Sequence, residues 1–151
     1  MIILKPGKEV TNKYKDLDFN TLSSVFTLIY DSYKTHKREH KIYLHIRLQC
    51  NIYSEYAWGD NCIYMSNQLP GEKLFLKHLL HEYRHYLQYR VFKVSSSLEE
   101  YDDSSFKKYH SSPVEVDARN FENIAGVKAI RLYYRLIKMK KYFAPFTYKK
   151  I

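Results

Sequence analysis

Residues 72–87 read EKLFLKHLLHEYRHYL, and they decide how the rest of the chain is interpreted. Apolar side chains recur along this stretch at spacings of three and four, which is the pattern of a helix with one buried side. These apolar positions are Leu76, Leu79, Leu80, Tyr83 and Leu87. Because Pro70, Gly71 and Glu72 are typical of a helix start, we expect a helix from about residue 71 to about residue 92.

The same stretch contains the pattern H-E-x-x-H at His81, Glu82 and His85. Residues four apart lie on one face of a helix, so both imidazoles can reach one metal ion with Glu82 beside it. Zinc prefers such ligands and lowers the pKa of its bound water to about 7. Glu82 is then expected to be the general base that takes a proton from this water and passes it to the leaving amine. With this histidine and glutamate content, the pattern arises by chance roughly 0.02 times per chain.

A catalytic zinc ion usually has three protein ligands, so a third must come from another segment. Glu115 is the first candidate, because it lies in PVEVDAR (residues 113–119), on the first turn of a second expected helix. Asp117 is on the same helix but points about 200° around the axis from Glu115, so the two are alternatives. His110, just before this helix, is a further alternative.

The flanking segments predict an α+β domain. Residues 19–35 have helical periodicity, and residues 42–48 alternate apolar and polar side chains like a half-buried strand. Residues 52–58 and 62–65 are expected to add to the sheet, and a helix from Pro113 is expected to reach about residue 140. We expect one domain over residues 1–151, with a flexible Ser-rich loop at 95–112 and a basic C-terminal helix and tail at 123–151.

H-E-x-x-H followed by the E-x-x-A pattern of Glu115 and Ala118 resembles the gluzincin branch of zinc metallopeptidases. Over roughly residues 40–125, the order of strands, zinc helix and glutamate helix is similar to the ImmA/IrrE-type peptidases of bacteria, phages and mobile elements. This resemblance implies a minimal zincin-like fold, with a small antiparallel or mixed sheet, a zinc-binding active-site helix and a second helix that bears the glutamate. It also implies one zinc ion held by His81, His85 and Glu115, with Glu82 as catalytic base. SprT-type minimal zincins are a second resemblance, and they would need His110 as the third ligand.

The chain departs from the gluzincin pattern one helical turn after Glu115. Many gluzincins place Asp or Asn four residues after the ligand glutamate, where it orients a zinc-bound histidine. Arg119 stands at that position here, so Asn120 or Asp117 would have to provide this support.

Peptide hydrolysis also needs a hydrogen-bond donor for the oxyanion that develops on the substrate. Tyr109 and His110 directly precede the glutamate helix and are the candidates, with ordinary surface positions as the alternative interpretation. In zincins the substrate lies extended along an edge strand. Residues 62–66, shortly before the zinc helix, are the expected edge strand.

The chain has 25 basic and 16 acidic residues, a formal charge of +9, and no acidic residue follows Glu122. Four cations on the last helix step by three, four and three and so form one stripe: Lys128, Arg131, Arg135 and Lys138. Such a stripe can bind the phosphates of DNA or an acidic partner, and a solvated face is the alternative interpretation.

The expected function is zinc-dependent hydrolysis of peptide bonds in an intracellular protein substrate. No apolar run approaches the roughly 18 residues of a membrane helix, and residues 1–6 lack the layout of a signal peptide, so we expect a cytoplasmic protein without a membrane partner. Two alternatives remain open. One is a nucleic-acid-associated protein that uses its basic C-terminal helix, and the other is a catalytically inactive zincin with a structural zinc ion.

Overall fold

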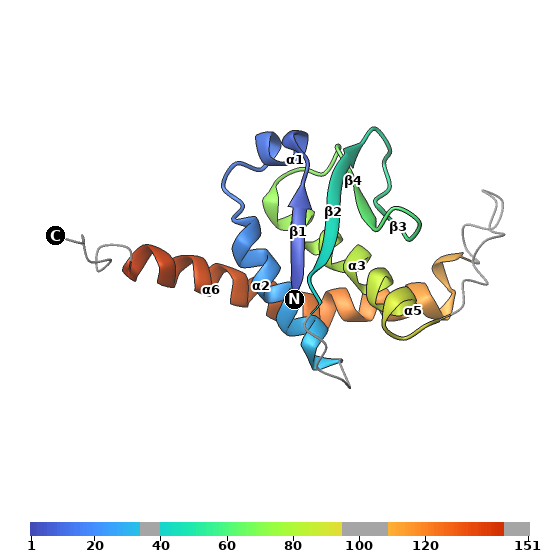
Figure 1. Cartoon of the computed structure of the whole chain (residues 1–151). Coiled ribbons are helices and arrows are strands. Elements are labelled where there is room, and N and C mark those ends of the chain that lie inside the picture. Colours follow the sequence, from blue (N-terminus) through green and yellow to red (C-terminus); the bar gives the residue numbers. More distant parts are fainter. Residues whose placement is uncertain (34–39, 95–108, 144–151) are drawn as a thin grey trace.

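The computed structural model describes residues 1–33, 40–94 and 109–143, and Figure 1 shows its mixed α+β architecture. The elements follow in the order β1 (Ile2–Pro6), α1 (Lys8–Lys13), α2 (Phe19–Ser32), β2 (Ile42–Gln49), β3 (Glu55–Ala57), β4 (Cys62–Ser66), α3 (Glu72–Arg90), α5 (Pro113–Phe121), the π-helical segment η2 (Glu122–Gly126) and α6 (Val127–Phe143). Most of the Ser-rich loop and the end of the C-terminal tail lie outside the described residues.

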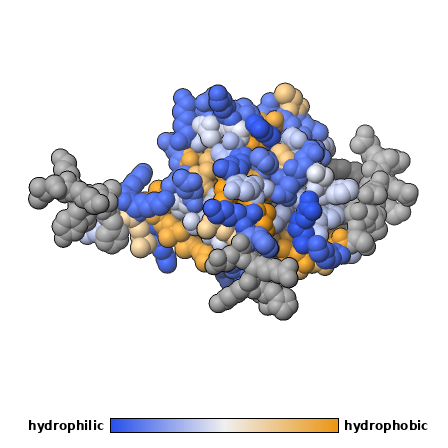
Figure 2. Space-filling model, in the orientation of Figure 1, coloured by the Kyte–Doolittle hydropathy of each residue, from blue (hydrophilic) through white to orange (hydrophobic). Residues whose placement is uncertain are grey.

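The four strands form one mixed sheet in the order β1-β2-β4-β3. β1 and β2 are parallel, as are β2 and β4, whereas β3 pairs with β4 in the antiparallel sense. In β2 the side chains of Leu44 and Ile46 are buried, whereas Tyr43, His45 and Arg47 are exposed. This alternation confirms a half-buried strand, and Figure 2 shows hydrophilic side chains over much of the surface where β1 and β2 lie.

The observed sheet differs from the sequence analysis at β1, β3 and β4. β1 was not expected, because its partner in the sheet is forty residues away and nothing local in Ile2–Pro6 signals the pairing. β4 is not the edge strand, because it lies between β2 and β3. The edge strand at this end of the sheet is β3, which also contacts α3. The extended part of residues 52–58 is limited to Glu55–Ala57.

Side-chain caps start α2 and α5, and a glycine precedes α3. The Asp18 side chain accepts a hydrogen bond from the Thr21 backbone N–H and starts α2. α3 follows Gly71, whose positive φ of 85° is a conformation that glycine adopts without strain. Ser112 caps α5 and Pro113 occupies its first turn, so both helices of the H-E-x-x-H and E-x-x-A patterns start close to the expected residues.

The last predicted helix is interrupted rather than uniform. Residues 113–143 are helical throughout, but Glu122–Gly126 form a π-helix between α5 and α6. The wider turn shifts the faces of α6 relative to those of α5. None of the helices among the described residues is long and apolar enough to cross a membrane.

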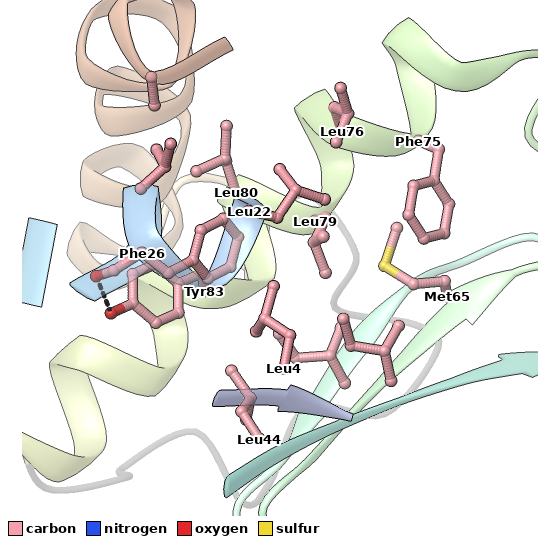
Figure 3. Packing of buried hydrophobic residues seen from close by; sticks show 14 of the residues in the cluster. Leu4, Leu22, Phe26, Leu44, Met65, Phe75, Leu76, Leu79, Leu80 and Tyr83 are labelled. Carbon is pink, nitrogen blue, oxygen red and sulfur yellow. Dashed lines mark hydrogen bonds between the residues drawn. The ribbon is translucent and has the colours of Figure 1, made fainter. Parts of the chain in front are cut away.

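The core lies between the sheet and α2, α3 and α6, and Figure 3 shows its centre. Tyr83, one of the two variable residues of the H-E-x-x-H pattern, is fully buried there and packs against the Phe26 ring. Its hydroxyl donates a hydrogen bond of 2.9 Å to the Phe26 carbonyl oxygen, drawn as a dashed line in Figure 3. α3 therefore turns one side to the core while its histidines face elsewhere.

Tyr83→Phe tests this arrangement. The substitution keeps the ring contact but removes the hydroxyl that donates to the Phe26 carbonyl oxygen, so we expect a loss of about 1 kcal/mol in the free energy of unfolding. Urea denaturation followed by circular dichroism measures it. Tyr43→Phe, at an exposed position of β2, is the matched control and should leave the stability within about 0.5 kcal/mol of wild type. Equal losses in both variants would contradict the assignment.

Candidate metal centre

His81, His85 and Glu115 converge between α3 and α5. The His85 Nε2 atom lies 3.0 Å from Glu115 Oε1, and the His81 Nε2 atom lies 3.4 Å from Glu115 Oε2. The two Nε2 atoms are themselves 3.3 Å apart. One potential ligand atom from each residue lies within 4.8 Å of the others, so this group could hold a metal ion.

The start of α5 places Glu115 opposite the histidines. The Ser112 hydroxyl accepts a hydrogen bond from the Glu115 backbone N–H, which sets Glu115 in the first turn. Ala118, one turn later, is completely buried and has no side chain beyond Cβ, so α5 can lie close against α3. Glu115 is consequently buried, with 3% of its surface exposed.

A second set of polar contacts orients the two imidazoles. The Nδ1 atom of His81 lies 3.1 Å from Glu122 Oε2, and Nδ1 of His85 lies 2.8 Å from Gln88 Oε1. Both partners are acceptors, so each histidine carries a hydrogen at Nδ1. The Nε2 atoms face Glu115, and loss of the proton there would leave a lone pair directed at a metal ion. The Gln88 amide is itself fixed, because its Nε2 donates to the Val114 carbonyl oxygen and to Asp117.

These contacts correct the expected support of the histidines. Asn120 has no contact with the imidazoles among the described residues, and Asp117 reaches His85 only through Gln88. Sequence reasoning did not single out Gln88 or Glu122. Gln88 stands three residues after His85, and Glu122 stands seven residues after Glu115. At these spacings two residues of a helix lie on the same face. This spacing is the sequence signal that could have identified Gln88 and Glu122.

Asp117 lies outside the ligand group because Arg84 holds it. The Arg84 guanidinium donates two hydrogen bonds to the Asp117 carboxylate, Nε at 2.7 Å and Nη2 at 3.1 Å. The rings of Tyr33, Phe92 and Phe121 lie around this guanidinium at about cation–π distance, 4.9–5.4 Å from their centroids. Arg84, which lies between His81 and His85 in the sequence, therefore ties α3 to α5 beside the ligand group.

Tyr109 and His110 separate in the structure. The Tyr109 hydroxyl hydrogen-bonds to Glu115, and burial together with this contact raises the pKa of Tyr109. The His110 ring contacts Arg119, with 3.2 Å between Nδ1 and Nη1, and its carbonyl oxygen accepts a hydrogen bond from the same guanidinium. Tyr109 thus lies at the ligand group, whereas the alternative ligand His110 is not a member of the His81, His85 and Glu115 group.

The buried charges are balanced within the group. Burial disfavours imidazolium at His81, but hydrogen bonds to Glu115 and Glu122 outweigh it and raise the pKa of His81 to about 10. Burial likewise disfavours the Glu115 carboxylate, yet hydrogen bonds from both histidines and Tyr109 hold its pKa well below the usual range. Burial raises the pKa of Glu82, which lies next to the group and accepts a hydrogen bond from the Tyr56 backbone.

The basic stripe lies on a different helix from the metal ligands. Its four members, Lys128, Arg131, Arg135 and Lys138, are all exposed on α6. The spacing-based expectation that they share one solvent-facing side of the helix is confirmed.

No protein-family model, curated protein or solved structure matches the chain. The assignment of the site therefore rests on the residues of this chain and their geometry.

Substitution of the two acidic residues of α5 tests the ligand group. Glu115→Gln removes the carboxylate that lies between the imidazoles, so we expect zinc affinity to fall by more than about 100-fold. Asp117→Asn changes a residue that contacts Gln88 and Arg84 but is not in the ligand group, and we expect it to keep stoichiometric zinc with a loss of at most about 100-fold. Competition with a chromophoric chelator gives both affinities. A larger loss in Asp117→Asn than in Glu115→Gln would overturn the assignment.

Zinc binding should also depend on pH with a defined sign. A raised pKa of about 10 means that His81 is protonated near neutral pH in the metal-free protein, and imidazolium has no lone pair for zinc. Zinc affinity should therefore rise with pH, about tenfold per pH unit for each proton displaced, between about pH 6 and pH 8. Chelator competition across this range, with proton release followed in a weakly buffered solution, measures it. A flat profile would contradict the protonated site.

Proposed function

We propose that the chain is a zinc-dependent peptidase of the minimal zincin type. The observation that carries the proposal is the convergence of His81, His85 and Glu115, with the buried Glu82 carboxylate directly beside them. Two imidazoles and one carboxylate are a ligand set of catalytic zinc sites, which leave one position open for water or substrate. A bound zinc ion would acidify that water and polarise the substrate carbonyl.

Glu82 is the residue that moves protons in this proposal. Its neighbours His81 and His85 on α3 would be ligands, so its carboxylate would stand next to the activated water, and burial raises its pKa, which favours its acting as a proton acceptor. It accepts the proton of the attacking water and then delivers it to the amine of the departing peptide. The hydrogen bond from the Tyr56 backbone holds the carboxylate in place during both steps.

Tyr109 is the candidate donor for the oxyanion. Its hydroxyl already lies at Glu115, on the side of the ligand group where residues 109–112 lead into α5. A phenol whose pKa is raised remains protonated and can donate a hydrogen bond to a carbonyl oxygen as negative charge develops. His110 has no such position because it contacts Arg119.

The substrate path is proposed along β3 rather than β4. β4 is hydrogen-bonded on both sides within the sheet, whereas β3 has a strand partner on one side only among the described residues. The backbone of Tyr56 in β3 reaches Glu82, so an extended peptide added to this edge would pass directly beside the base.

Glu82→Gln separates an active peptidase from a zincin that keeps zinc only for structure. The amide cannot accept the proton of the attacking water, so we expect hydrolysis of a quenched-fluorescent peptide library to fall by about 100-fold or more. Zinc content by elemental analysis should be unchanged, because the ligands remain. Wild-type zinc binding without cleavage of any library member, or equal rates for wild type and Glu82→Gln, would favour the inactive zincin.

A further inference from the structure

We propose that the exposed face of α6 is a docking surface for the phosphate backbone of double-stranded DNA. This surface, called here the basic face, consists of Lys128, Arg131, Arg135 and Lys138. It belongs to a different helix from the metal ligands, and the proposal does not depend on peptidase activity.

The basic face is a row of cations without a salt-bridge partner in the part of the chain that the structure describes. The four side chains span eleven residues of helix, from Lys128 to Lys138, and the first and last lie about 15 Å apart along the axis. No ion pair joins any of them to another residue within 1–33, 40–94 or 109–143. Lys140, by contrast, turns toward the body and pairs with Asp18 at 2.9 Å. The four cations are therefore available to an outside anion.

The opposite side of α6 is firmly attached to the body. Ala129 and Tyr133 are buried in the core, and the Tyr133 hydroxyl accepts a hydrogen bond from the Asp18 backbone N–H. The Tyr134 hydroxyl donates to Glu72 at 2.8 Å. Asp18 and Glu72 thus contact α6 through Lys140 and Tyr134, and no described carboxylate pairs with a cation of the basic face.

The arrangement favours a DNA duplex over a membrane surface. A membrane-surface helix inserts its apolar side into the lipid, but here that side packs on the core. The basic face also favours a duplex over a single strand. Single strands are held by several stacking aromatic rings. On the described part of α6, only the exposed Tyr142 continues the line of the four cations as an aromatic residue. Figure 1 shows the C-terminal part of α6 extending past the sheet.

The proposal is tested with a fluorescein-labelled DNA duplex of arbitrary sequence and the full-length chain. Anisotropy titrations over a range of salt should give a slope of log K against log salt of about −3.6, which corresponds to four phosphate contacts. Replacement of all four residues of the basic face by Gln, a good helix former, should weaken binding at low salt by at least about tenfold and flatten the slope.

A matched control separates the basic face from the overall charge of +9. The control variant carries four Gln substitutions at exposed lysines outside α6: Lys8, Lys15, Lys41 and Lys73. It has the same net charge as the first variant and should bind the duplex nearly as well as wild type. Circular dichroism confirms that both variants are folded.

Three results would overturn the proposal: equal losses in the two variants, no duplex binding at low salt, or binding to vesicles of anionic lipid that exceeds binding to the duplex. Glu82→Gln and zinc removal should leave duplex binding unchanged. This outcome distinguishes a failure of the DNA surface from a failure of the peptidase proposal.

Discussion

The structure depends on one buried contact, in which Glu115 of α5 lies between the imidazoles of His81 and His85 on α3. Burying three ionisable side chains is unfavourable unless each is paired and hydrogen-bonded. Here every member is satisfied: the carboxylate by the histidines and Tyr109, and the imidazoles by Glu122 and Gln88 at their other nitrogens. A divalent cation would take the place of protons in this cluster, so the geometry that suits the metal-free protein also suits a metal ion.

α3 meets several demands within five residues. His81 and His85 face α5, Tyr83 points into the core, and Arg84 reaches Asp117. This distribution follows from helical geometry, since consecutive residues are about 100° apart around the axis. The candidate metal centre is therefore built on the same helix that packs on the sheet, and Tyr83, a core residue, lies between the two histidines in the sequence. Such a site has little freedom to change its geometry, which suits chemistry that needs preorganised groups.

The helical segment from residue 113 to residue 143 connects the candidate metal centre with the basic face. Its first part contributes Glu115 and Glu122 to the metal centre, and its last part carries the basic face. The π-helical turn at Glu122–Gly126 lies between them. Glu122, the last acidic residue of the chain, begins this turn and is held by His81 and Lys77. Negative charge is thus gathered at the metal centre, and the remainder of the segment is left positive.

What the sequence alone determined are the features that depend on neighbours along the chain. The period of α3 places His81, Glu82 and His85 together, the alternation in β2 predicts its buried face, and Ser112 with Pro113 marks the start of α5. The tertiary structure alone decided which residues meet across elements. Gln88 and Glu122 as partners of the histidines, Tyr109 rather than His110 at Glu115, and the inner position of β4 all belong to this second kind. These features share one physical reason for being invisible in the sequence. Each depends on the direction of side chains or strands brought together from distant segments, and local propensity carries no information about that direction.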